Sequence, residues 1–98
     1  MPDDLPPVVQ STAYFVVAEA LTNAVKHSGA TQLVVRIRRV DADVHIEVRD
    51  DGCGGARVGG HGRLRGARDR VEALGGWFHV ADLPDGGTRL QGRLPCAS

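Results

Sequence analysis

The segment of residues 13–25 constrains the fold most, because its apolar side chains recur at helical intervals. Seven residues follow three- and four-residue steps and form one apolar stripe, namely Ala13, Val16, Val17, Ala20, Leu21, Ala24 and Val25. A helix with such a stripe has to bury it against another layer of structure. Ser11 or Thr12 can cap this helix, which is predicted to run to about His27 and to stop at Gly29.

Two pairs of alternating segments supply the second layer. In residues 32–40 and 44–49 apolar side chains recur at every second position and so lie on one face of a strand. A short turn at residues 41–43 joins the two segments. Residues 77–83 and 88–94 form a second pair around the turn Pro84-Asp-Gly-Gly87. Both pairs are predicted to be antiparallel hairpins with one face buried under the helices.

A second helix is predicted between the hairpins. Its inner face carries Leu64, Ala67, Val71 and Leu74, and Gly75-Gly76 end it. This order of elements predicts an α/β two-layer sandwich, with the helices packed on one face of a mainly antiparallel, mixed sheet. Residues 1–9 contain three prolines and are interpreted as a lead-in or linker, so the domain is expected to span residues 10–95.

The composition excludes several classes of protein. The 98-residue chain has zero formal net charge, which gives no general electrostatic basis for binding nucleic acid or an anionic membrane. No apolar run approaches the roughly 20 residues that span a bilayer, and the N-terminus lacks a signal-peptide pattern. Cys53 and Cys96 fit no metal-ligand spacing, and a disulfide-stapled domain would carry more cysteines. A cytoplasmic location without direct membrane contact is therefore expected for this segment.

Three polar residues share a second face of the first helix. Glu19, Asn23 and Lys26 follow one another at four- and three-residue steps. The asparagine offers a neutral carbonyl oxygen, which Mg²⁺ accepts beside phosphate oxygens and water. The lysine offers a positive charge for phosphate, and the glutamate can orient or deprotonate a water. A plain solvated helix face would show the same spacing.

The string Asp50-Asp-Gly52-Cys-Gly54 stands where the second strand ends. A carboxylate fixed there can accept a hydrogen bond from an exocyclic amine such as the 6-amino group of adenine, whereas guanine presents a keto oxygen. Gly52 and Gly54 would let the backbone turn tightly against a flat ring. An ordinary strand-ending turn is the alternative interpretation.

A glycine-rich loop connects this string to the second helix. Residues 50–63 contain six glycines in fourteen residues, and Arg57, Arg63 and Arg65 lie along the loop and at the start of the helix. Free backbone amides, the helix N-terminus and the guanidinium groups would converge there on a polyphosphate. A surface loop with solvated arginines is the competing interpretation.

Together these segments resemble the ATP-binding catalytic domain of two-component sensor histidine kinases. That domain shares a superfamily with type II topoisomerases, heat-shock chaperones and mismatch-repair ATPases. Residues 19–27 resemble its N box, residues 50–54 its first glycine box, residues 60–66 its second and residues 85–88 its last. Residues 66–76 are similar to the branch that pairs with regulators of the nitrate-response and desaturase-control type. The resemblance implies the ATP-binding fold of this family, truncated at its N-terminus.

The resemblance also implies a role for each matched residue. Asn23 would hold Mg²⁺ against the phosphates of ATP, and Lys26 or His27 would approach the phosphate tail. Glu19 would polarise the attacking group, which is the imidazole of a partner helix or a water. The adenine would be read by Asp50 beside Gly52 and Gly54. The remaining nucleotide contacts would come from Gly60, Gly62, Arg63, Leu64, Gly66 and Thr88.

The implied partners are ATP, the dimerisation helices that carry the phosphorylated histidine and, indirectly, a response regulator. None of the four histidines stands in a phosphoacceptor-like context, so that histidine is expected on a separate segment or chain. A missing first strand would expose a sheet edge, and a homodimer through that edge is a further expectation.

Two alternative functions stay open from the sequence. One is a serine kinase of the anti-sigma-factor type, which shares the N box and the first glycine box. The other is a non-catalytic interaction module, favoured by the irregular second glycine box, in which Arg63 stands between Gly62 and Leu64.

Overall fold

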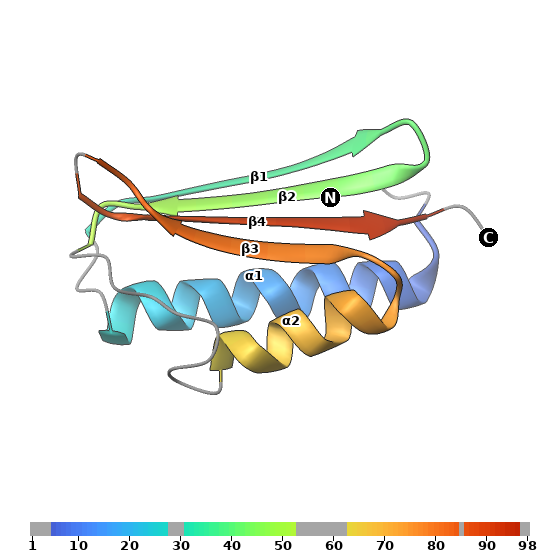
Figure 1. Ribbon diagram of the computed structural model, residues 1–98, viewed down its shortest axis with the longest axis horizontal. Coiled ribbons are helices and arrows are strands. Elements are labelled where there is room, and N and C mark those ends of the chain that lie inside the picture. Colours follow the sequence, from blue (N-terminus) through green and yellow to red (C-terminus); the bar gives the residue numbers. More distant parts are fainter. Residues whose placement is uncertain (1–4, 28–30, 53–62, 85, 97–98) are drawn as a thin grey trace.

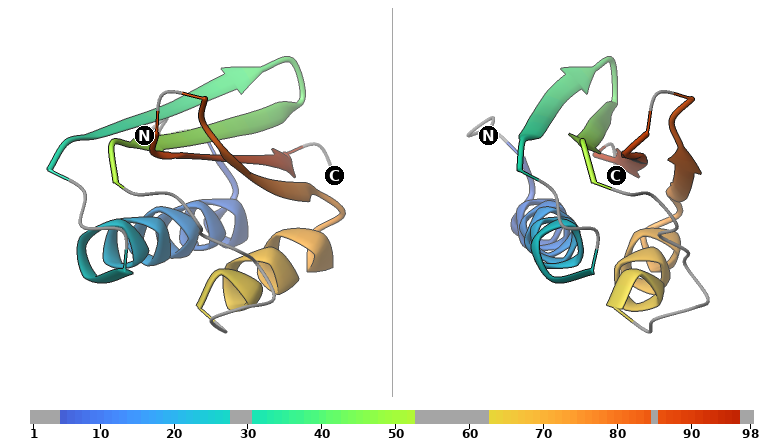
Figure 2. Two further views of the ribbon diagram at one scale, coloured as in Figure 1. Left: turned by 60° about the vertical axis from the view of Figure 1, so that its left-hand side comes forward. Right: turned by 90° about the vertical axis from the view of Figure 1, so that its left-hand side faces the viewer.

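The computed structural model describes residues 5–27, 31–52, 63–84 and 86–96. Within them two helices, α1 (Pro7–His27) and α2 (Arg63–Ala73), lie on one face of a four-stranded sheet (Figures 1 and 2). The strands are β1 (Leu33–Val40), β2 (Asp43–Asp50), β3 (Trp77–Asp82) and β4 (Thr88–Pro95), in the order β1-β2-β4-β3. Because both helices cover one face of this sheet, the predicted two-layer sandwich is confirmed. Every strand pair in the described sheet is antiparallel, so the parallel part of the expected mixed sheet is absent from the described residues.

Helix α1 begins at Pro7, four residues before Ser11 and five before Thr12, the two residues predicted to cap it. Proline is well suited to the first helical position, because its φ is already helical and its missing N–H would have no partner there. The backbone N–H groups of Val9 and Gln10 both donate to the carbonyl oxygen of Pro6 at 3.0 Å. The interpretation of residues 7–9 as an extended lead-in was therefore wrong, whereas the helix end at His27 is as predicted.

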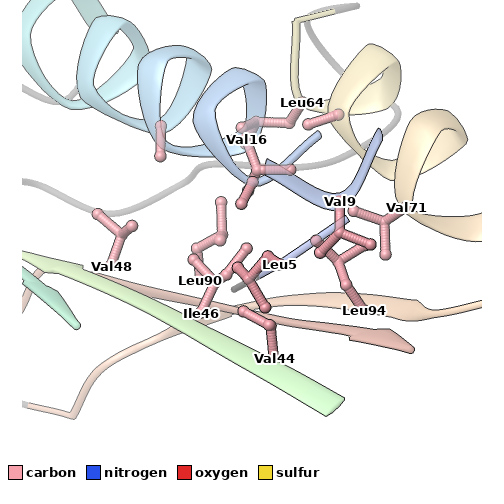
Figure 3. Packing of buried hydrophobic residues seen from close by; sticks show 13 residues of the cluster. Leu5, Val9, Val16, Val44, Ile46, Val48, Leu64, Val71, Leu90 and Leu94 are labelled. Carbon is pink, nitrogen blue, oxygen red and sulfur yellow. The ribbon is translucent and has the colours of Figure 1, made fainter. Parts of the chain in front are cut away.

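The core lies between the helices and the inner face of the sheet, where the labelled side chains of both layers point toward one another (Figure 3). Helix α1 contributes a stripe that is narrower than predicted: Val25 is 63% exposed, and Val17 and Leu21 are only partly buried. The stripe extends instead toward the N-terminus at Val9, and Leu5, which precedes the helix, is buried as well. The buried cluster consists of Leu5, Val9, Ala13, Val16, Ala20, Val44, Ile46, Val48, Leu64, Ala67, Val71, Leu90 and Leu94.

The two predicted hairpins are present, but the helices cover them unequally. Val44, Ile46 and Val48 of β2 are all buried, because this strand is central in the sheet. On the edge strand β1, Val35 is 39% exposed although it was predicted to face the core. Helix α1 therefore covers the middle of the sheet more fully than its β1 edge.

Helix α2 ends as predicted, at a glycine pair. Gly75 has a positive φ of 84°, and its N–H donates to the carbonyl oxygen of Glu72 at 2.9 Å. The N–H of Gly76 donates to the carbonyl oxygen of Val71 at 3.0 Å, which completes a Schellman cap. A Cβ atom at Gly76 would lie 1.9 Å from the carbonyl oxygen of Arg93, so the chain turns into β3 with no room for a side chain. No helix among the described residues is long and apolar enough to cross a membrane.

The central position of Ile46 gives a direct test of this packing. Ile46 is 1% exposed in the middle of the core, and Ile46→Ala is expected to lower the free energy of unfolding by about 2–5 kcal/mol through lost burial and a cavity. Val25→Ala, on the exposed side of α1, should change it by less than about 0.5 kcal/mol. Urea denaturation measures both values, and equal effects would contradict the assignment of the core.

Candidate nucleotide site

A small hollow opens where several elements meet at one end of the molecule. The C-terminal end of α1, the N-terminal end of α2, the end of β2 and the start of β4 gather there, at the left of Figure 1. The hollow has a volume of about 10 Å³, close to that of one water. Its lining comes from five elements and consists of Ala20, Asn23, Val48, Asp50, Leu64, Val80, Thr88 and Leu90.

Two buried oxygens in this lining have no hydrogen-bond partner among the described residues. They are Oδ1 of Asn23 and Oγ1 of Thr88, and each of these residues is only 4% exposed. A buried oxygen without a partner costs free energy, and almost all such groups in folded proteins are satisfied. This pair marks the hollow as a place built to receive polar groups from a ligand or water, although larger hollows exist elsewhere on the surface.

Asn23 reaches the hollow because it stands three residues after Ala20, at the end of the buried stripe. The sequence placed it on a separate polar face with Glu19 and Lys26, and its burial shows that this placement was wrong for Asn23. Its free carbonyl oxygen is a ligand type that Mg²⁺ accepts. No group of three or more His, Cys, Asp or Glu residues in the described part of the chain is arranged to hold a metal. The single free oxygen of Asn23 fits a metal ion that takes one protein ligand and fills its other positions with phosphate and water.

Asp50 is the last residue of β2 and lies opposite Thr88 in the β2–β4 register. Its Oδ1 accepts a hydrogen bond from the backbone N–H of Gly52 at 2.8 Å, which fixes the carboxylate and starts the turn after the strand. Its Oδ2 has no hydrogen bond within the described residues.

Gly87 brings the ends of β2 and β4 together. Its φ is 93°, and a Cβ atom there would lie 2.0 Å from the carbonyl oxygen of Asp50. Only glycine tolerates both the left-handed backbone and this contact. The close approach sets Asp50 beside Thr88 and so places a carboxylate and a hydroxyl at one wall of the hollow.

Asp51 holds the segment that follows α1, a role that the sequence did not suggest. Its carboxylate accepts three hydrogen bonds: from the Thr31 backbone N–H at 2.7 Å, the Thr31 hydroxyl at 2.6 Å and the Gln32 N–H at 2.9 Å. These bonds, led by the one from the Thr31 hydroxyl, lower the pKa of Asp51 from 3.8 to about 2. The contact joins residues about twenty positions apart, so no local sequence signal announces it.

Three other predicted site residues are described by the structure but lie outside the lining of the hollow. Glu19 is partly buried on α1. Gly66 lies nearest the ring of Phe15, at the contact between the two helices. Gly52 is buried directly after Asp50 and Asp51.

For the remaining predicted site residues the structure describes no side chain. Lys26 and His27 form the last turn of α1 and Arg63 begins α2, but their side chains are outside the description. Gly54, Gly60 and Gly62 lie outside the described residues altogether.

Chain comparisons place this fold in a known family. Residues 8–98 match the family described as histidine kinase-, DNA gyrase B- and HSP90-like ATPases. The chain is 27% identical over 94 residues to sensor protein VraS of Staphylococcus aureus and 25% identical over 95 residues to that of Staphylococcus epidermidis. These matches cover 93% and 94% of the chain, which spans 27% of the length of either relative.

Two solved structures are similar in fold and in sequence. The ATP binding domain of PrrB from Mycobacterium tuberculosis has a TM-score of 0.72 and 30% identity, over 90% of this chain and 69% of its own. The histidine kinase domain of the Erythrobacter litoralis EL346 blue-light activated histidine kinase has a TM-score of 0.75 and 26% identity, over 93% of this chain and 49% of its own.

The chain belongs to the histidine kinase-, DNA gyrase B- and HSP90-like ATPase family. Among its members it resembles the ATP-binding domains of sensor histidine kinases, as the sequence predicted.

The carboxylate of Asp51 predicts how stability responds to acid. Because its pKa is lowered on folding, its contribution is complete above its ordinary value of 3.8 and is lost as the pH falls toward 2. Asp51→Asn is therefore expected to lower Tm at pH 7 and to lose its difference from the parent chain near pH 2. Asp69→Asn, on the exposed face of α2, serves as the control. A Tm difference for Asp51→Asn that stays constant over this range would contradict the role of its charge.

Proposed function

We propose that this chain binds Mg-ATP in the hollow and donates the γ-phosphoryl group to a histidine on a separate dimerisation domain. The observation that carries the proposal is the pair of unpartnered buried oxygens, Asn23 Oδ1 and Thr88 Oγ1, around one hollow with Asp50. Membership in the ATPase family supports ATP as the ligand. The wider kinase activity rests on resemblance to proteins of which this chain spans only a part.

The base would be held by one carboxylate and an apolar wall. Asp50 Oδ2 would accept a hydrogen bond from the 6-amino group of adenine while Oδ1 stays bound to Gly52. Val48, Val80 and Leu90 would contact the ring, since they form the apolar part of the lining. Guanine would present an acceptor to a carboxylate that is itself only an acceptor, so ATP would be preferred to GTP.

The phosphates would extend from the base toward the end of α1. Asn23 Oδ1 would hold Mg²⁺, which neutralises charge on the phosphates when bound. The Thr88 hydroxyl would donate a hydrogen bond to a phosphate oxygen, which would give both unpartnered atoms a partner. Lys26, His27 and Arg63 would supply positive charge, and Glu19 would polarise the attacking group. Phosphoryl transfer depends mainly on such positioning and charge stabilisation.

Binding would require the hollow to widen. At about 10 Å³ it is far smaller than the roughly 300–1,000 Å³ of ordinary ligand pockets. Leu64 is the large apolar lining residue best placed to move, because it stands at the first turn of α2, whereas Val48, Val80 and Leu90 lie within strands. The small volume of the hollow and the irregular second glycine box together favour the alternative of a non-catalytic module, which predicts no nucleotide affinity. The serine kinase remains a further alternative, distinguished by a target serine.

The partners and the cellular location of this segment stay predictions. They comprise the dimerisation helices, a response regulator and a cytoplasmic location, and the domain bounds at residues 10–95 are a prediction as well. A homodimer through the sheet edge is supported by β1, an edge strand in the described sheet on which Val34, Val35 and Val40 are 38–48% exposed.

Asp50→Asn tests the reading of adenine. ATP should bind more tightly than GTP to the parent chain, and the substitution should weaken ATP binding by about 1–3 kcal/mol through loss of a charged hydrogen bond. Asp43→Asn, at the opposite end of β2, is the matched control and should leave the affinity unchanged. Isothermal titration measures the affinity of each nucleotide for the parent chain and for both variants. Equal binding of ATP and GTP to the parent chain would refute the role of Asp50.

Asn23→Ala tests the metal site separately from the base. Removing Oδ1 should abolish the dependence of ATP affinity on Mg²⁺ while leaving metal-free binding in place. Thr22→Ala is the control, because the Thr22 hydroxyl donates to the Ala18 carbonyl at 3.0 Å within α1 and does not line the hollow. A variant that keeps the full Mg²⁺ dependence would show that the metal is held elsewhere.

A further inference from the structure

The face of the sheet opposite the helices is open and strongly basic. No described element covers it (Figures 1 and 2). Side chains alternate along a strand, and Val44, Ile46 and Val48 of β2 point inward, so the residues between them point outward. The residues that lie opposite these on the neighbouring strands β1 and β4 point outward too. This rule places five arginines and two carboxylates on the open face, namely Arg36, Arg38, Arg49, Arg89, Arg93, Asp43 and Glu47. The excess of positive charge is local, because the whole chain has zero formal net charge.

Most of these arginines are unpaired within the described part of the chain. Arg93 donates from Nε to Asp43 Oδ2 at 2.7 Å, and this is the ion pair of the face. Arg36 stands opposite Glu47 in the β1–β2 register, yet no ion pair joins them. Arg36 and Arg38 are exposed on the edge strand, with their guanidinium groups free to bind carboxylates from outside.

Two of these arginines, Arg36 and Arg38, border a hollow on this face. It has a volume of about 170 Å³, and Arg36, Arg38, His45, Glu47, Trp77 and Gln91 line it. Trp77 is 42% exposed, and Val34 and Val40 on the same face are 48% and 38% exposed. Arginine and tryptophan are the residues most enriched among those that dominate the energy of protein interfaces. The surface thus combines a charged groove with apolar side chains at its margins.

The spacing and the chemistry select the kind of ligand. Arg36 and Arg38 are two residues apart on a strand, about 7 Å, which is also the repeat of alternate side chains in an extended peptide. Glu47 in the middle of the face would repel a row of phosphates, whereas a peptide can offer it backbone N–H donors. A nucleic acid would also call for several aromatic stacking platforms, and Trp77 is the single tryptophan of the chain.

We propose that this open face, distinct from the hollow that holds Asn23 and Asp50, docks an extended acidic segment of a partner protein. Carboxylates at alternate positions of that segment lie on Arg36 and Arg38, and an apolar side chain packs against Trp77. The face lies on the far side of the sheet from the helices, so docking does not compete with the nucleotide and does not depend on the proposed kinase activity.

The test uses the full chain and a short labelled peptide of alternating glutamate and serine residues that ends in one leucine, the apolar side chain for Trp77. Peptide binding is followed by fluorescence anisotropy and by the emission of Trp77, the only tryptophan. Arg36→Ala/Arg38→Ala should weaken binding at least about fivefold, and added salt should weaken binding to the parent chain, as expected for ion pairs at a surface. Arg68→Ala/Arg70→Ala removes the same charge from α2 and should change the affinity less than about twofold.

The outcomes separate the proposal from its rivals. If the peptide leaves Trp77 emission unchanged, or if both double variants lose affinity equally, the proposed docking surface is wrong. If a single-stranded oligonucleotide or phosphatidylserine vesicles bind more tightly than the peptide and lose affinity with Arg36→Ala/Arg38→Ala, the ligand is not an acidic protein segment. Should this alanine pair unfold, Arg36→Gln/Arg38→Gln retains more of the side-chain bulk and answers the same question.

Discussion

The close approach of Gly87 to the end of β2 is the contact on which the rest of the site depends. A side chain at this position would collide with the Asp50 carbonyl, and the backbone there is left-handed. Glycine therefore permits the register that sets Asp50 opposite Thr88. Helix α1 crosses beneath this pair and brings Asn23 to the same place, so a carboxylate, a hydroxyl and a carboxamide from three separate elements meet.

At this end of the core, the arrangement that favours ligand binding lowers the stability of the free protein. Most of the interior is aliphatic and closely packed, but the core ends in two buried oxygens that the described residues leave unpaired. Such atoms destabilise the free protein, and a ligand that pairs them recovers that free energy on binding. The open face of the sheet also carries charge without a partner, since four of its five arginines form no ion pair within the described structure, whereas Arg93 pairs with Asp43. The two faces thus offer two separate places for binding.

Much of the fold and part of the site could be read from the sequence because they rest on local signals. Alternation predicted the hairpins, and the pair Gly75-Gly76 predicted the end of α2. The start of α1 was missed because three nearby prolines outweighed the fact that Pro7 can begin a helix. The burial of Asn23 and the bonds from Asp51 to Thr31 could not be predicted, because each depends on contacts between strands or layers.

The most direct test of the account is nuclear magnetic resonance of the labelled chain during titration with Mg-ATP. The side-chain amide of Asn23 and the backbone amides of Gly52 and Thr88 should shift together at one affinity, because these groups border a single hollow and its neighbouring turn. The backbone amide resonances of Arg36 and Arg38, whose side chains point to the other face of the sheet, should not shift. If Asn23 and Thr88 do not respond while other parts of the surface do, the shared hollow is not the nucleotide site and the account fails.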